Sequence, residues 1–129
     1  MKILWILTFV RVKMSDLNNL QNSVLPPVDK IEFGKIFAPK MIIAEYKNGK
    51  WSDLSVEPLH NLSLHPATLV FHYGQAIFEG MKAFMRADGQ IGLFRPEDNA
   101  KRMTTSAKRM LLPVLDESVF LSAVNQVVQ

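Results

Sequence analysis

The dipeptide Asn48-Gly49 constrains the fold of this chain most strongly, because it separates two β-prone runs. The compact run Met41–Tyr46 comes just before it, and Lys50-Trp51 resumes the apolar pattern directly after it. Both turn residues tolerate a positive φ, which a tight two-residue turn requires at each of its central positions. The sequence therefore predicts an antiparallel hairpin over these residues.

A second hairpin is predicted over Met81–Phe94. Its turn is Asp88-Gly89, which separates Lys82–Arg86 from Gln90–Phe94, and Asp-Gly favours the same type of turn. Between the two hairpins, the segment Glu57–Pro66 carries a proline near each end and is predicted to be an irregular connection.

Two helices are predicted after the second hairpin. Pro96 suits the first helical position, and Lys108 and Arg109 suit the last turn. Pro113 then ends this helix. Its apolar side consists of Ala100, Met103, Ala107, Met110 and Leu111. Asp116 is a good N-cap for the next helix. The inner side of that helix consists of Val119, Phe120, Ala123, Val124 and Val127. Antiparallel hairpins with flanking helices amount to an α+β fold.

The first thirteen residues differ in character from the rest of the chain. A basic residue and the apolar run Ile3–Val10 resemble the start of a signal peptide, but the run is short and has no small-residue cleavage site. It is also too short to span a bilayer. We therefore expect residues 1–13 to be an upstream extension before a natural start at Met14, with a membrane-directing role as the alternative. Residues 14–32 are expected to form a polar arm or linker.

The charge of the chain does not indicate a nucleic-acid partner. The formal net charge is +3, and Lys2, Arg11 and Lys13 supply three positive charges before the first acidic residue. The remaining basic residues are balanced by the 12 acidic ones. A composition of 48% hydrophobic and 21% charged residues indicates a globular chain. We expect no nucleic-acid partner and no membrane partner.

Metal and thiol chemistry have little support in the sequence. There is no cysteine, so the chain offers no disulfide and no thiolate ligand. His60, His65 and His72 lie five and seven residues apart, without the i, i+4 spacing of a metal-binding pair on a helix. We expect them to be surface or hydrogen-bonded histidines, and we expect no metal site.

The stretch Phe71–Phe84 is the densest mixture of aromatic and polar residues in the chain. Its aromatic content argues against an exposed loop, whereas polar residues such as Glu79 and Lys82 argue against a plain core segment. Gly74 and Gly80 would allow a turn or a close approach of another group. The stretch is interpreted as the lining of a pocket, with an ordinary buried turn leading into a strand as the alternative.

At these residues the chain resembles the N-terminal part of a branched-chain amino acid aminotransferase, a pyridoxal-phosphate enzyme of the class IV, or fold type IV, group. The resemblance runs from about Phe33 to Pro113. Its most specific parts are His72-Tyr73-Gly74-Gln75-Ala76-Ile77-Phe78-Glu79-Gly80-Met81-Lys82-Ala83-Phe84, Leu93-Phe94-Arg95-Pro96 and Asn99-Ala100-Lys101-Arg102-Met103. The combination, in this order and spacing, is specific even though each piece alone is weak.

The resemblance implies that residues 33–129 form the small α+β domain of such an enzyme, cut within its last helix and without the C-terminal large domain. It also implies that Arg102 binds the phosphate of pyridoxal phosphate, for which a guanidinium group is well suited. Periodicity alone indicates a solvated surface arginine, since Arg102 lies about 125° from the centre of the apolar side of its helix.

The resemblance assigns three further residues to substrate binding. Phe78 matches an aromatic residue that lines the pocket for the branched side chain, and Tyr73 matches a tyrosine that reaches the neighbouring subunit's pocket. Gly80 would permit close approach of the backbone. The alternative for each aromatic is an ordinary core residue, and Gly80 could simply begin a strand. Glu79 and Lys82 receive no assignment.

The parent reaction implied is transfer of an amino group between leucine, isoleucine or valine and 2-oxoglutarate, in a cytoplasmic homodimer that serves branched-chain amino acid biosynthesis. That chemistry requires a lysine that forms a Schiff base with the cofactor. None of the ten lysines matches its position. No catalytic residue is therefore assigned, and this fragment alone is expected to be inactive.

Two alternatives remain open. The parent could be another class IV enzyme, such as a D-amino acid aminotransferase or an aminodeoxychorismate lyase. Alternatively, the chain could be a non-catalytic module that binds a partner through its exposed surface.

Overall fold

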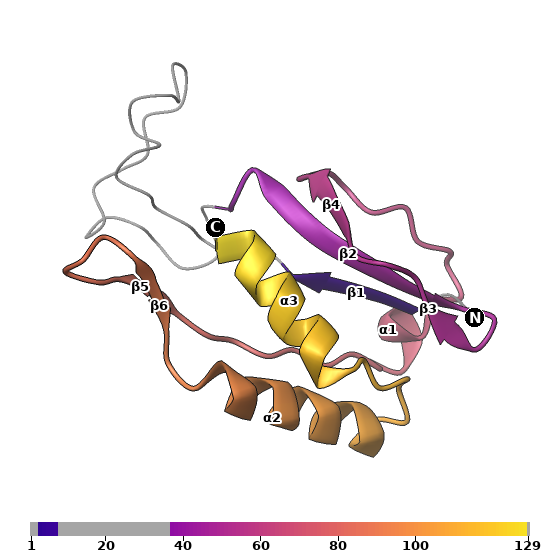
Figure 1. Ribbon diagram of the computed structural model, residues 1–129. Coiled ribbons are helices and arrows are strands. Elements are labelled where there is room, and N and C mark those ends of the chain that lie inside the picture. The colour runs from indigo at the N-terminus through magenta and orange to yellow at the C-terminus, as the bar shows by residue number, and fades with distance from the viewer. Residues whose placement is uncertain (1–2, 8–36, 129) are drawn as a thin grey trace.

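The computed structural model describes residues 3–7 and 37–128. Within these residues, the helix α3 crosses one face of an antiparallel sheet, the helix α2 packs beside α3, and a separate hairpin projects beside the helices (Figure 1). The elements in chain order are β1 (Ile3–Leu7), β2 (Lys40–Lys47), β3 (Lys50–Trp51), β4 (Ser55–Pro58), α1 (Leu69–His72), β5 (Ala83–Met85), β6 (Ile91–Leu93), α2 (Pro96–Arg109) and α3 (Glu117–Val128).

The long strand β2 is the centre of the larger sheet. It pairs antiparallel with β1, where Trp5 lies opposite Ala44. It also pairs antiparallel with β3 and with β4, where Ile42 lies opposite Val56. The buried residues Met41–Ala44 therefore lie in a strand whose backbone is paired along both of its edges. Pairing on both edges satisfies backbone polar groups that burial would otherwise leave without a partner.

Both predicted hairpins are confirmed. At the β2–β3 turn, Asn48 has φ 54° and Gly49 has φ 82°, as the tight turn type requires. β5 and β6 form a separate two-stranded sheet, in which Gly89 has φ 77° and donates its N–H to the carbonyl of Arg86. The Asp88 carboxylate accepts the N–H of Gln90 and so stabilises this turn.

Both predicted helices are also confirmed. α2 begins with Pro96 in its first turn and has Lys108 and Arg109 in its last turn. At the start of α3, the Asp116 carboxylate accepts the N–H of Ser118, as expected of an N-cap residue.

The helices bury one shared core against β2. The core cluster consists of Ile42, Ala100, Met103, Leu115, Phe120, Ala123 and Val124. α3 crosses the face of the sheet and α2 lies beside it (Figure 1). Trp51 ties the first hairpin to the α2–α3 connection, because its indole N–H donates to the carbonyl of Val114 at 2.9 Å.

The predicted apolar side of α2 is wrong at its C-terminal end. Ala100, Met103 and Ala107 are buried, but Met110 is partly exposed and Leu111 is 86% exposed. The helix ends at Arg109, and Leu111 adopts a left-handed conformation with φ 53°. The N–H of the next residue then bonds to the carbonyl of Ala107. This Schellman-type ending turns the chain away before the 3.6-residue period can bring Leu111 back to the core.

The prediction for Glu57–Pro66 is wrong in part. Its first two residues belong to β4, which pairs with the start of β2, so Pro58 lies opposite Lys40. A proline is compatible with the end of a strand that needs no further N–H donor on that side. The rest of the segment is irregular, as expected.

Part of the expected upstream extension lies in the sheet. Ile3–Leu7 form β1, whereas the remainder of residues 1–13 and the whole polar arm 14–32 fall outside the described residues. The natural start at Met14 stays a prediction. Among the residues that the structure describes, no helix has both the length and the apolar character needed to cross a membrane.

Two phenylalanine substitutions should differ greatly in their effect on stability. Phe120 is 2% exposed within the core cluster, whereas Phe78 is 92% exposed. Phe120→Ala should lower the free energy of unfolding by about 3–5 kcal/mol, because it removes buried apolar surface and leaves a cavity. Phe78→Ala should change it by less than about 0.5 kcal/mol. Urea denaturation monitored by circular dichroism measures both, and equal losses would contradict the packing described above.

Candidate functional site

Most of the stretch Phe71–Phe84 is exposed, contrary to the expectation of a buried turn. Its last part does line an open groove, through Gly80, Met81, Lys82 and Phe84. Tyr73 is 82% exposed, and Phe71, Phe78 and Phe84 are also more than half exposed. α1 forms a single helical turn with no buried residue. The aromatic content of the stretch therefore does not come from packing in the core of the described residues.

Residues Gln75–Gly80 alternate between a side facing the helices and a side facing away. Gln75, Ile77 and Glu79 are half-buried, whereas the residues between them are exposed. Ile77 packs against the core cluster. Gln75 donates a side-chain hydrogen bond to the carbonyl of Met110 at the end of α2, at 2.8 Å. The segment therefore runs along the helix with one row of side chains turned toward the protein.

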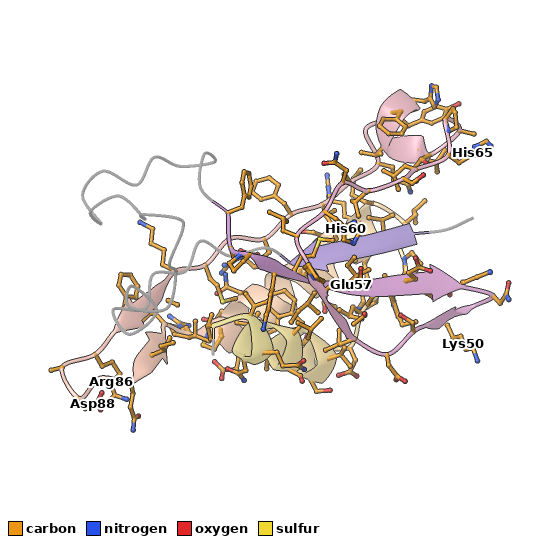
Figure 2. All side chains as sticks on the ribbon, turned by 90° about the horizontal axis from the view of Figure 1, so that it is seen from above. Lys50, Glu57, His60, His65, Arg86 and Asp88 are labelled. Atoms are coloured by element: carbon orange, nitrogen blue, oxygen red, sulfur yellow. The ribbon has the colours of Figure 1, made fainter. Side chains whose placement is uncertain are left out.

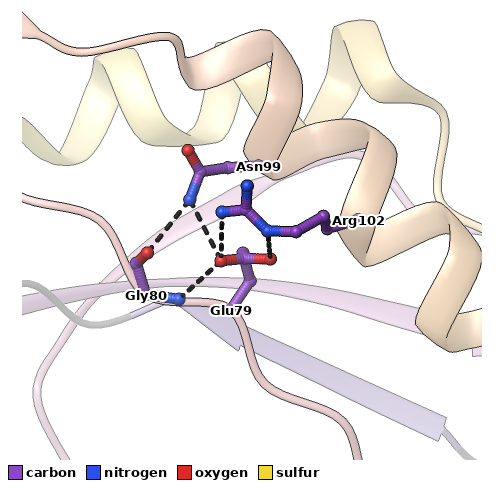
Figure 3. Close-up of polar contacts among 4 residues, drawn as sticks. All are labelled: Glu79, Gly80, Asn99 and Arg102. Carbon is purple, nitrogen blue, oxygen red and sulfur yellow. Dashed lines mark hydrogen bonds and ion pairs between the residues drawn. The ribbon is translucent and has the colours of Figure 1, made fainter.

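A polar cluster joins this segment to the middle of α2 (Figure 3). Arg102 donates two hydrogen bonds to the Glu79 carboxylate, from Nε to Oε2 at 3.1 Å and from Nη2 to Oε1 at 2.9 Å. Asn99 donates from Nδ2 to Glu79 Oε1 and to the carbonyl of Gly80, both at 3.0 Å. The N–H of Gly80 donates to Glu79 Oε1 at 3.1 Å. Glu79 is therefore bound on both of its oxygens.

The cluster lowers the pKa of Glu79 below its ordinary value. Desolvation by burial disfavours the charged carboxylate and raises its pKa, but hydrogen bonds from Arg102 and Asn99 and the charge of Arg102 lower it further than burial raises it. The hydrogen bonds to Glu79 and the negative charges of Glu79 and Asp98 raise the pKa of Arg102 further than burial lowers it. At neutral pH the two side chains therefore form an ion pair, in which the Glu79 side chain is 14% exposed and that of Arg102 is 59% exposed.

The ion pair lies at an open groove of about 410 Å³, a volume within the usual range of small-molecule sites. The groove is formed by the segment after Glu79, by the end of the second hairpin and by the first turns of α2. Its lining consists of Gly80, Met81, Lys82, Phe84, Phe94, Arg95, Asp98, Asn99 and Arg102.

The lining of the groove is basic on balance. Lys82, Arg95 and Arg102 carry positive charges there, and Asp98 carries the negative one. Arg95 forms an ion pair with Asp98 and has a left-handed backbone with φ 48°, which is uncommon for a residue with a side chain. Two phenylalanines, Phe84 and Phe94, supply flat apolar surface beside these charges. Such a lining suits a planar ligand that carries an anionic group.

The structure brings together two of the four residues proposed for binding. Arg102 and Gly80 both line the groove, whereas Tyr73 and Phe78 are exposed and do not line it. Sequence reasoning left Glu79 without a role and did not single out Asn99. The i, i+3 spacing of Asn99 and Arg102 places both on one face of a helix and could have indicated a shared partner.

The histidines lie away from this groove. Figure 2 shows His60 beside Glu57, and the His60 Nε2–Glu57 Oε2 distance is 2.8 Å. His65 accepts the N–H of Ala67, and His72 contacts the carbonyl of Pro66 at 2.7 Å. All three are exposed and hydrogen-bonded, as expected. In the described part of the chain, no three histidine, cysteine or acidic side chains gather as they would around a metal ion.

The lowered pKa of Glu79 makes a testable contribution to stability. Its stabilising effect is fully present above the ordinary pKa of 4.5 and is lost as the pH falls through the lowered value. Glu79→Gln should lower the thermal midpoint at pH 7 by about 2–8 °C, and this difference from the wild type should shrink below about pH 4.5. Glu97→Gln removes an equal charge from an exposed site on α2 and is the control. A pH-independent difference for Glu79→Gln would contradict the assignment.

The chain is similar in sequence to several branched-chain amino acid aminotransferases. The chain is 42% identical over 105 residues to branched-chain-amino-acid transaminase 1 of Bacillus subtilis, covering 81% of this chain and 30% of that protein. It is 40% identical over 104 residues to the cytosolic branched-chain-amino-acid aminotransferase of Saccharomyces cerevisiae, covering 80% and 28%. The cytosolic enzyme of Rattus norvegicus is 42% identical over 106 residues, with 81% and 26% covered.

No protein-family model matches the sequence. The chain spans less than a third of the length of the relatives just described, as an N-terminal fragment of such an enzyme would. The resemblance drawn from the motifs is confirmed: about four fifths of this chain is similar in sequence to part of the branched-chain amino acid aminotransferases.

Proposed function

We propose that these residues are the small domain of a fold type IV, pyridoxal-phosphate-dependent branched-chain aminotransferase, and that the groove at Arg102 receives the phosphate of the cofactor. The observation that carries the proposal is the basic groove itself, which combines Arg102, Lys82 and Arg95 with exposed aromatic surface. The whole enzyme would transfer the amino group between leucine, isoleucine or valine and 2-oxoglutarate, in the cytoplasm and as a homodimer.

The donor set of the groove fits a phosphate ester. Such a group carries a charge of about −1.5 to −2 at pH 7 and accepts several hydrogen bonds. A guanidinium group has five N–H donors, and Glu79 accepts two of those of Arg102. Within the described residues, the other three have no protein acceptor, so Arg102 can still donate to a phosphate oxygen. Gly80 adds no side chain, and a Cβ placed there would meet nothing within 4 Å.

Tyr73 and Phe78 are proposed to contact substrate, Phe78 in the pocket for the branched side chain and Tyr73 in that of the neighbouring subunit. Their high exposure supports this, since neither contributes to the core of the described residues. Aliphatic side chains are held by apolar surface with few polar markers. The described residues leave both aromatics largely uncovered, and substrate, a second subunit or the rest of the enzyme would supply that cover.

Pyridoxal phosphate, when bound, acts as the electron sink for the reaction at the substrate's Cα. The residues of this chain would bind and orient it: Arg102 at the phosphate, with Phe84 and Phe94 excluding water from one side of the groove. The reactive lysine and the acid facing the pyridine nitrogen are proposed to come from the part of the enzyme that these residues do not match. No residue of this chain is proposed to move a proton.

A partner-binding module is the second candidate. It is favoured by the same exposed side chains, because Phe71, Tyr73 and Phe78 present aromatic surface without cover from described residues. Such patches mark interaction sites in soluble proteins. Under this proposal the chain would bind another aminotransferase subunit and would not bind the cofactor by itself.

Two arginines of α2 provide the test of the cofactor site. Arg102→Ala should weaken pyridoxal phosphate binding by about tenfold or more, since a charge-assisted hydrogen bond to the phosphate is lost. Arg109→Ala removes the same charge seven residues further along the helix, away from the groove, and should change the affinity by less than about twofold. Absorbance titration of both variants with pyridoxal phosphate measures the effect. Equal affinities would show that Arg102 is only a surface residue.

The 129-residue chain alone should not catalyse transamination. Incubated with leucine and pyridoxal phosphate in a single-turnover assay, it should convert leucine no faster than the free cofactor does, because no lysine in it matches the reactive one. The readout is the keto acid formed. Turnover above that background, abolished by borohydride reduction of the protein-bound cofactor, would contradict this expectation.

A further inference from the structure

We propose that Glu79 is a positioning residue, which holds the Arg102 guanidinium so that its opposite edge faces the groove. The inference rests on the proposed function, in which Arg102 binds the phosphate of the cofactor. Glu79 itself does not line the groove and would not touch the cofactor. It would act through Arg102.

The geometry of the ion pair determines which edge of Arg102 is free. Glu79 receives Nε–H at 3.1 Å and Nη2–H at 2.9 Å, so the carboxylate lies along the edge of the guanidinium that carries Nε. Two parallel hydrogen bonds fix the plane of the group as well as its position. The edge formed by Nη1 and the second Nη2 hydrogen is left for a ligand. That edge also has the two-donor spacing that suits a phosphate.

Glu79 is itself held rigidly, which distinguishes it from an exposed counter-ion. Asn99, which is 6% exposed, donates to Glu79 Oε1 and to the Gly80 carbonyl. The backbone N–H of Gly80 donates to the same carboxylate oxygen. The Glu79 carboxylate is therefore held both by a side chain of α2 and by the backbone of its own segment. Without this fixed partner, an arginine side chain that is 59% exposed would sample many rotamers.

A simple competing role for Glu79 predicts the opposite change in ligand affinity when Glu79 is removed. If Glu79 only neutralised Arg102, its negative charge would repel a phosphate, and its removal would strengthen binding. If Glu79 positions Arg102, its removal weakens binding, because the arginine must be ordered when the ligand arrives. High salt screens the repulsion between exposed charges but leaves the ordering cost. At high ionic strength, removal of Glu79 therefore weakens ligand binding if Glu79 positions Arg102, and leaves it unchanged or stronger if Glu79 only neutralises Arg102.

The test uses the 129-residue chain, with inorganic phosphate and pyridoxal phosphate as probes at about 0.5 M salt, where the Debye length is below about 8 Å. Glu79→Gln should weaken the binding of both probes by about three- to thirtyfold, on the order of the rotamer freedom that an arginine side chain carries. Glu97→Gln, which removes the same charge from an exposed position of α2, should leave both affinities within about twofold. Unchanged or stronger binding by Glu79→Gln would overturn the proposal.

A spectroscopic signature separates positioning from a general structural role. In the wild type, the Arg102 Nε–H should exchange slowly with water and should stay hydrogen-bonded when phosphate saturates the groove. In Glu79→Gln, that proton should exchange at least about tenfold faster, while the backbone amide spectrum stays that of the folded chain. Should the variant not fold, the wild type decides alone: loss of the Nε–H hydrogen bond on adding phosphate would mean that the ligand displaces Glu79, and would overturn the proposal.

Failure of the underlying function gives a different pattern. If Arg102→Ala leaves the affinity for both probes unchanged, or if the wild-type chain binds neither, the phosphate site at Arg102 is wrong and the role of Glu79 is wrong with it. If Arg102→Ala weakens binding and Glu79→Gln does not, only the positioning role is wrong. Each outcome therefore assigns the failure to one of the two proposals.

Discussion

The packing of α3 on the central strand β2 is the interaction on which the rest of this structure depends. Ile42 and Val124 are completely buried where the helix crosses the strand, and Phe120 fills the space beside them. Burying such side chains stabilises the fold by about 1.5–3 kcal/mol each. α2 then packs against α3 through Ala100 and Met103, which turns the adjacent face, with Asn99 and Arg102, toward Glu79. The groove at Arg102 thus exists because a purely apolar contact elsewhere orients the helix that carries it.

Local signals in the sequence predicted most of the elements. The turn residues gave both hairpins, because a positive φ at Asn48 and Gly49 depends on those two residues alone. The caps gave both helices for a similar reason. The errors arose where tertiary context decides. Periodicity extended the apolar side of α2 to Leu111, but the helix ends at Arg109 and Leu111 itself adopts the left-handed conformation that turns the chain away. The segment Glu57–Pro66 was predicted to be irregular, but its first two residues belong to β4, which pairs with an edge of β2.

The candidate site was predictable only in part. Periodicity correctly placed Arg102 on the polar side of α2, and the resemblance, not the pattern, singled it out among the arginines. Glu79 lies 23 residues earlier in the sequence, so no local rule pairs it with Arg102. The exposure of the aromatic stretch Phe71–Phe84 was not predictable from its residues. Aromatic residues are usually buried, so composition predicted a buried stretch. These side chains are exposed because no described residue packs over them, and composition alone does not show which residues will be covered.

The segment from Gln75 to Gly80 is held to α2 by hydrogen bonds at both of its ends. The Gln75 side chain donates to the carbonyl of Met110 at the end of the helix, and Asn99 in the first turns of the helix donates to the carbonyl of Gly80. Between such ties an extended chain has no freedom to rotate, so the inward position of Ile77 commits its neighbour Phe78 to point outward. The outward display of this aromatic ring is thus a property of the backbone, and a different side chain at the same position would be displayed in the same direction.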